Sequence, residues 1–141
     1  MSFAYRFHPG TRLALLRGDG PFTFAEWERA TLSVLEQPAW QGTRRILSDR
    51  RRMGGPFPPQ MEELVVDFFR RHAAALGEVR WAVVIPLDPE AIGTVRLAAE
   101  LSKNTRVRVQ GFTDIGVALQ WILGVHPHDH IAALTRWIDE A

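Results

Sequence analysis

The 141-residue sequence contains no cysteine, a single tyrosine and only one lysine among its 17 basic residues. The absence of cysteine excludes disulfides, thiolate metal sites, cysteine-ligated iron–sulfur clusters and cysteine nucleophiles. No apolar run approaches the roughly 20 residues of a membrane span, and residues 1–8 lack the apolar core of a secretion signal. We therefore expect a soluble, cytoplasmic protein without a membrane span.

Neither sign of charge is in large excess. The sequence has 17 basic and 16 acidic residues, which gives a net charge of +1. This balance argues against nucleic acid as the main partner. The sequence is 46% hydrophobic and 23% charged, which is ordinary for a globular protein. A chain of this length can build one core without disulfides or a structural metal.

The order of apolar segments predicts the fold class. Short apolar or alternating runs predict five strands, at residues 3–8, 11–17, 44–49, 81–85 and 106–110. Apolar residues at helical spacing predict five helices, at residues 24–37, 59–76, 91–101, 114–123 and 126–140. Strands alternate with helices after an opening hairpin. We therefore expect an α/β fold, with a mixed, largely parallel sheet of about five strands, an N-terminal antiparallel hairpin and flanking helices.

Turn and capping residues set the expected boundaries. The sequence Gly18-Asp19-Gly20-Pro21 is expected to end the second strand, and Thr23 with Glu26 forms a capping box for the first helix. The third strand is expected to end at Asp49, with a long loop over residues 50–58, and Pro59 suits the start of the next helix. Thr113 is the expected N-cap of the fourth helix. Trp27, Trp81 and Trp121 fall on predicted buried faces.

Three short motifs then suggest a family. The segment 107–123, with Phe112, Asp114, Ala118 and Trp121 at its landmarks, resembles the closing strand and "F-x-D, A-x-x-W-L" helix of the SpoIIAA-like group in the STAS superfamily. Residues 46–49 resemble that group's strand ending in Asp, and residues 93–96 resemble its G-x-x-R motif. The resemblance covers about residues 3–124. It implies a SpoIIAA-like domain over residues 1–125, with residues 126–141 as a C-terminal helical extension.

The resemblance also implies a function, with one departure. Anti-sigma-factor antagonists of this superfamily are phosphorylated on a Ser or Thr at the helix after the third strand. No Ser or Thr occurs here between Ser48 and Thr94, so that acceptor has no counterpart. The leading expectation is a non-enzymatic regulatory or protein-interaction module that lacks the phospho-acceptor. The STAS/SEC14-like branch is associated with small hydrophobic ligands, which gives an alternative class.

Arginines near the third predicted strand support this second class, in which the protein binds a small ligand. Five of them occur within nine positions: Arg44, Arg45, Arg50, Arg51 and Arg52. The alternative is a carrier or sensor of a small anionic amphipathic ligand, such as a lipid or phosphate ester. Arg50, Arg51 and Arg52 would bind the head group, Gly54 and Gly55 would let the backbone approach, and Phe57 would cover the apolar body. The competing interpretation is a solvated basic face with Asp49 and Glu62 or Glu63 as counter-ions.

Histidines near the C-terminus form the other candidate cluster, at His126, His128 and His130. Zinc needs three or four ligands in tetrahedral array, but His128 and His130 point to different sides of a helix. We therefore expect no metal and no cofactor. A metal-dependent enzyme using residues 126–130 is the remaining enzymatic alternative, since no hydrolase, metalloprotease or Walker motif is present.

The last helix has an apolar face formed by Ile131, Leu134, Trp137 and Ile138. This face must be buried, because a contiguous exposed apolar surface is unfavourable in water. The helix is expected either to dock on its own sheet or to form a homodimer with a second copy.

Overall fold

A computed structural model describes residues 3–54, 57–58, 60–124 and 128–140, and for residues 42 and 128–130 the backbone alone. Five strands form one sheet in the order of the sequence. They are β1 (Phe3–His8), β2 (Leu13–Pro21), β3 (Arg45–Gly54), β4 (Val79–Val84) and β5 (Val107–Phe112). Strands β1 and β2 are antiparallel and all other pairs are parallel. The predicted fold class is confirmed.

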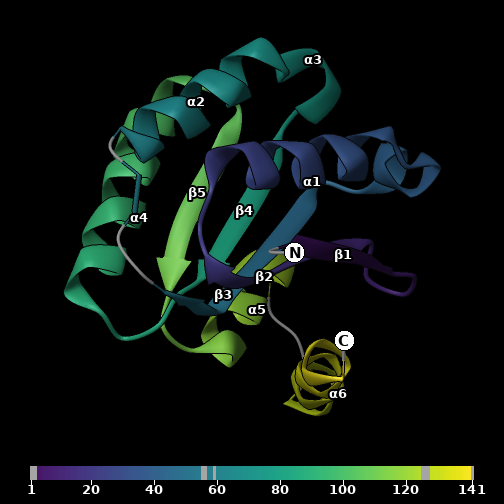
Figure 1. The fold of residues 1–141 in the computed structure, drawn as a ribbon. Helices are drawn as coiled ribbons and strands as arrows, with labels where there is room; N and C mark the ends of the chain where they lie inside the picture. The colour runs from purple at the N-terminus through teal and green to yellow at the C-terminus, as the bar shows by residue number, and fades with distance from the viewer. Residues whose placement is uncertain (1–2, 55–56, 59, 125–127, 141) are drawn as a thin grey trace.

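Helices cover both faces of this sheet, as Figure 1 shows. They are α1 (Phe24–Glu36), α2 (Met61–Arg71), the short α3 (Ala73–Leu76), α4 (Pro89–Leu101), α5 (Ile115–Leu123) and α6 (His128–Asp139), with 3-10 turns at Pro38–Gly42 and Ser102–Asn104. Helices α1, α2 and α4 contribute to the larger apolar cluster, and α5 and α6 contribute to the smaller one on the opposite face. No helix in the described ranges combines the length and apolar character that a membrane crossing requires.

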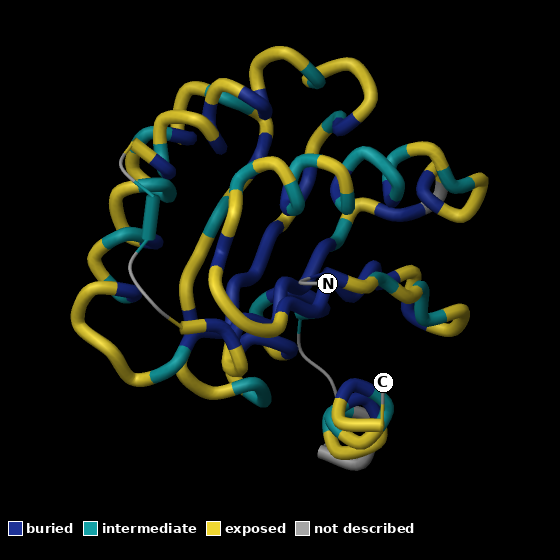
Figure 2. Tube along the Cα trace, in the orientation of Figure 1, coloured by how far each residue is buried: buried dark blue, intermediate teal, exposed yellow. Residues whose placement is uncertain are grey.

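Strand β4 is covered on both faces, which explains why its sequence is apolar from Trp81 to Val84. In β4, Trp81 and Val83 belong to the larger cluster, whereas Ala82 and Val84 belong to the smaller one. Alternate residues of a strand point to opposite faces, so a strand covered on both sides must be apolar throughout. Figure 2 shows the central strands buried along their length, while the helices alternate buried and exposed positions.

Helix α6 lies on the chain's own sheet. Leu134 and Ile138 are buried in the cluster that contains Leu13 and Leu15 of β2. The Trp137 ring meets the His8 ring edge-on at 4.9 Å. The apolar face of this helix is therefore covered within one chain.

Several predicted boundaries were wrong. Strand β2 continues through the glycines to Pro21, and β3 continues through residues 50–54, because the two extensions pair with each other in parallel. Pairing between strands here outweighs the turn preference of Gly and Pro. The predicted loop over residues 50–58 is therefore a strand up to Gly54, and Pro59 lies outside the described residues.

The helix predictions also needed corrections. The helix expected over residues 59–76 ends at Arg71, and a separate short helix follows. Within α2, Leu64 is exposed although it is apolar. Helix α5 is capped by Asp114, which accepts a hydrogen bond from the Val117 amide, and not by Thr113. An ionised carboxylate suits the positive helix N-terminus better than a hydroxyl. Trp121 is only half-buried.

Thr23 is confirmed as the N-cap of α1, and its contribution can be tested. Thr23 Oγ1 accepts a hydrogen bond from the Glu26 amide, and its hydroxyl donates to Glu26 Oε1 at 2.9 Å. We expect Thr23→Ala to lower the free energy of unfolding by about 1 kcal/mol, because an amide at the helix start loses its acceptor. Urea unfolding measures this. Thr23→Ser, which keeps the hydroxyl, should lose less than half as much, and equal losses would contradict the capping role.

Candidate functional site

A change of register in β3 directs one arginine into the interior. Arg17 of β2 pairs with Asp49 of β3, and Asp19 pairs with Arg52. Between these two pairs β2 advances by two residues and β3 by three, so β3 carries one extra residue. Such bulges redirect side chains and occur often beside functional sites. Arg50 lies within this irregular stretch and lines cavities beneath α2 and α4.

Arg50 is a buried cation with no carboxylate partner among the residues that the structure describes. Only 6% of its surface is exposed. Its Nε is buried without a hydrogen-bond partner, and no ion pair to Arg50 occurs among the described residues. Its guanidinium lies over the Phe22 ring, 5.1 Å from the centroid. Burial lowers the pKa of Arg50 to about 10, so the group remains charged at neutral pH.

Two cavities meet at Arg50. The outer one has a volume of about 250 Å³ and is lined by Arg50, Met53, Gly54, Phe57, Ile85, Pro86, Asp88 and Ala91. The inner one, of about 20 Å³, has room for roughly one water-sized group. The indole of Trp27 lines the inner cavity, and its Nε1 is a second buried donor without a partner in the described part of the chain. Both residues line the inner cavity, and both donors are buried without a partner in the described part of the chain.

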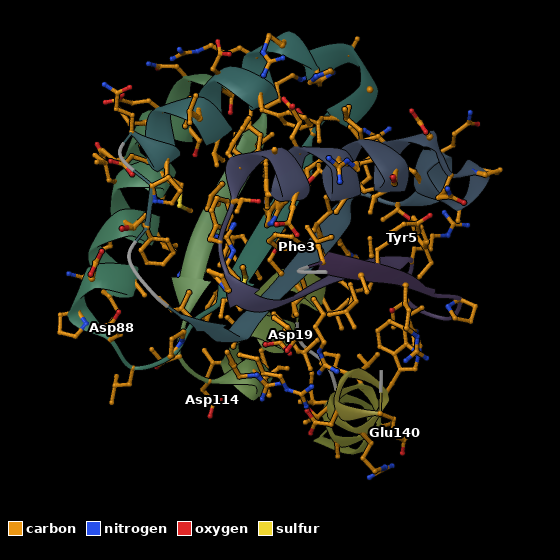
Figure 3. All side chains as sticks on the ribbon, in the orientation of Figure 1. Phe3, Tyr5, Asp19, Asp88, Asp114 and Glu140 are labelled. Atoms are coloured by element: carbon orange, nitrogen blue, oxygen red, sulfur yellow. The ribbon has the colours of Figure 1, made fainter. Side chains whose placement is uncertain are left out.

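The outer cavity lies where ligands commonly bind in α/β proteins, at the carboxyl ends of parallel strands. It adjoins the N-terminus of α4, whose cap Asp88 accepts a hydrogen bond from the Ala91 amide at 3.2 Å. Figure 3 shows Asp88 and Asp114 at the same end of the sheet. Asp88 lines the cavity, as Glu62 lines the inner one, yet neither forms an ion pair with Arg50. The outer cavity is therefore lined by one cation, Arg50, and by one carboxylate, Asp88, which caps the helix end.

Arg51 has a different role from its neighbour. It donates from Nε to Asp49 Oδ1 at 2.9 Å and from Nη2 to Asp139 of α6 at 3.2 Å. Asp49 also accepts two hydrogen bonds from Arg17 of β2. Arg51 therefore joins the sheet to α6 on the face opposite Arg50, and the prediction that it helps to bind the head group is not supported by its position.

The remaining predicted site residues lie at different places in the structure. Arg52 is exposed and pairs in register with Asp19. Gly54 and Phe57 line the outer cavity with Arg50, whereas Gly55 lies outside the described residues. Arg44 and Arg45 lie at the amino end of β3, at the other edge of the sheet. The structure thus brings together Arg50, Gly54 and Phe57 of the predicted set.

Neither the missing phospho-acceptor nor the histidine cluster corresponds to a site within the described ranges. Ser48, the nearest hydroxyl to the missing phospho-acceptor, is fully buried and accepts a hydrogen bond from Trp81 Nε1 at 2.8 Å. His126 lies outside the described residues, as do the side chains of His128 and His130. Elsewhere in the described part, no three His, Asp or Glu side chains are placed to hold a metal ion.

Sequence reasoning missed Phe22, Trp27, Ile85 and Asp88 as parts of this site. Trp27 carried an apolar signal that predicts only a core position. Pro86 and Asp88 after an apolar strand marked a turn and an N-cap, which together indicate a helix start at the carboxyl edge of the sheet. That signal was available in the sequence.

Comparison with solved structures identifies the fold. The chain is similar to an uncharacterized protein of the DUF3478 family with a SpoIIAA-like fold from Shewanella loihica PV-4, with a TM-score of 0.57 and 16% sequence identity. The match covers 86% of this chain and 92% of that one. No protein-family model and no curated protein matches the sequence. The chain therefore has a SpoIIAA-like fold, as the sequence motifs predicted.

Proposed function

We propose that this protein is a non-enzymatic binding module for a small anionic ligand with an apolar body, held at Arg50. The observation that carries the proposal is an arginine, 6% exposed, that lines a cavity and has no counter-ion in the described part of the chain. An isolated buried charge costs several kcal/mol, so an anion that enters the cavity recovers part of that cost.

The cavity restricts the ligand's chemistry. A guanidinium offers a planar pair of donors that suits a carboxylate or a phosphate. Met53, Phe57 and Ile85 supply an apolar wall beside it. A volume of about 250 Å³ is just below the roughly 300–1,000 Å³ typical of drug-sized ligands. We therefore propose a short aliphatic or aromatic carboxylate, or the phosphate ester of such a group, rather than a long-chain lipid.

Binding of such a ligand would be the signal that regulates this protein. A phosphorylated switch of the kind found in anti-sigma-factor antagonists would need a hydroxyl near the start of α2, and the sequence has none between Ser48 and Thr94. Occupancy of the Arg50 cavity would replace phosphorylation as the signal. Its walls come from β3, from the segment that follows β4 and from α4, so a bound ligand would stabilise their relative positions.

Calorimetric titration with benzoate, hexanoate and phenyl phosphate tests the proposal. We expect at least one of these anions to bind saturably, and Arg50→Gln to weaken it about tenfold to a hundredfold, because a charge-assisted contact contributes roughly 1.5–3 kcal/mol. Arg51→Gln is the matched control, since its side chain lies on the opposite face, and it should retain the affinity.

Neutral analogues separate charge recognition from simple apolar binding. Benzyl alcohol and hexanol have the same apolar bodies, and we expect them to bind at least tenfold more weakly than the anions. Equal binding of neutral and charged probes, or equal losses in the two variants, would contradict a head-group role for Arg50.

A further inference from the structure

A second group of arginines lies at the opposite end of the sheet, away from the Arg50 cavity. Parallel pairing places Arg45 of β3 beside Arg80 of β4, and Arg80 beside Arg108 of β5. Neighbouring strands are about 4.8 Å apart, and like charges directly opposite one another are destabilising. Three adjacent strands therefore hold a row of three cations at a cost to stability.

This row lines a cleft of about 680 Å³ with two further arginines. Its lining consists of Arg44, Arg45, Glu78, Val79, Arg80, Thr105, Arg106 and Arg108. The single carboxylate among them, Glu78, is 75% exposed and lies 3.8 Å from Arg106. A loose, exposed pair of this kind contributes little. Five guanidinium groups thus share one weakly placed acid.

Two of these arginines are held in place by backbone carbonyls. Arg45 Nη1 donates to the Thr11 carbonyl at 3.1 Å, and Arg80 Nη1 donates to the Trp121 carbonyl at 3.0 Å. The Arg80 guanidinium also lies over the Trp121 ring, 5.8 Å from its centroid. A guanidinium has five N–H donors, so each retains donors for a ligand after this contact. The anchoring lowers the entropy lost when an anion binds.

We propose that this cleft binds a small molecule carrying two or more phosphate groups. Phosphates match the charge and planar donors of several guanidinium groups at once. The volume lies within the range of small-molecule sites. Because the whole chain has a net charge of only +1, the basic character is local to this cleft, which favours a compact polyanion over nucleic acid.

Inorganic tripolyphosphate is the probe, and calorimetry on the full chain is the measurement. We expect saturable binding with one site per chain. The double variant Arg44→Gln/Arg108→Gln should weaken it about a hundredfold or more, because it removes two charge-assisted contacts. Both side chains are exposed and form no ion pair among the described residues, so the substitutions should leave the fold intact.

The control variant Arg29→Gln/Arg70→Gln removes the same two charges from exposed positions on α1 and α2. It should bind tripolyphosphate within about threefold of the unmodified chain, since neither side chain lines the cleft and exposed charges are screened by salt. An equal loss of tripolyphosphate affinity in both double variants would contradict this site. A titration that shows no saturable binding would contradict it as well.

Two further measurements distinguish this site from others. Arg50→Gln should leave tripolyphosphate binding unchanged, so failure of the Arg50 proposal would not affect this one. A single-stranded RNA oligonucleotide should bind more weakly than tripolyphosphate and be displaced by it. If the oligonucleotide binds more tightly and resists displacement, the cleft is a nucleic-acid surface and the proposal is wrong.

Discussion

Asp49→Ala is expected to lower the free energy of unfolding by about 3–5 kcal/mol, a large share of the stability of a domain this size. Only 2% of the Asp49 side chain is exposed, and its two oxygens accept hydrogen bonds from Arg17 of β2 and Arg51 of β3. Removing the carboxylate leaves the buried Arg17 without the acceptor of those bonds. Urea unfolding at neutral pH measures the loss.

Asp139→Ala is the matched control. Asp139 forms one ion pair with the same Arg51, but its side chain is 56% exposed. Exposed ion pairs contribute roughly 0–1 kcal/mol, so we expect a loss of at most about 1 kcal/mol. Comparable losses in the two variants would show that burial of Asp49 does not determine its contribution.

The contribution of Asp49 should also depend on pH. Burial raises the pKa of Asp49, but hydrogen bonds and charge from Arg51, together with Arg17, outweigh burial and hold the pKa below 3.8. The folded state then binds this proton less readily than the unfolded state, so stability from Asp49 is complete above about pH 4 and is lost as the pH falls through its folded pKa. The difference between the unmodified chain and Asp49→Ala should therefore shrink below pH 4.

The fold was predictable because its signals are local. The strand at residues 81–85 and the helices beginning near Phe24 and Pro89 carry their own apolar period and caps, so composition over a few residues determines them. The extension of β2 and β3 through Pro21 and Gly54 was not predictable in this way. Those residues are strand only because each segment pairs with the other, and a parallel partner distant in sequence leaves no local signal.

The candidate site was predictable in part for a related reason. The sequence marks Arg50, Arg51 and Arg52 as equivalent, since all three follow one another in a basic run. Strand alternation and one extra residue in β3 then separate them, placing Arg50 inside, Arg51 on the α6 side and Arg52 in solvent. Arg44 and Arg45 precede Arg50 by six and five residues, which separates them by roughly 15–20 Å because a strand rises about 3.3 Å per residue. The basic run indicated that an arginine could bind an anion, and the register of β3 against β2 determined that Arg50 is the arginine that lines the cavity.

Arg50→Met is expected to stabilise the protein by about 1–3 kcal/mol. Burial lowers the pKa of Arg50 from its ordinary value to about 10, which corresponds to roughly 3 kcal/mol of unfavourable burial of the charge. The contact with the Phe22 ring offsets part of that cost and is lost in the variant. Methionine has a flexible apolar side chain that can fill the space beside Phe22 without a charge. Urea unfolding should show a higher midpoint with an unchanged slope.

Arg17→Met gives the contrasting result, because Arg17 is as buried as Arg50 but donates to a buried carboxylate. Its loss should destabilise the chain by about 3–5 kcal/mol. Two buried arginines on neighbouring strands would then respond with opposite signs, which is expected if only one of them is retained for a ligand. If Arg50→Met is destabilising instead, Glu62, which lines the inner cavity with Arg50, is a candidate counter-ion, and Glu62→Gln should then cost a similar amount. That pair of losses would show that the charge of Arg50 is neutralised within the chain, and the argument for an anionic ligand would fail.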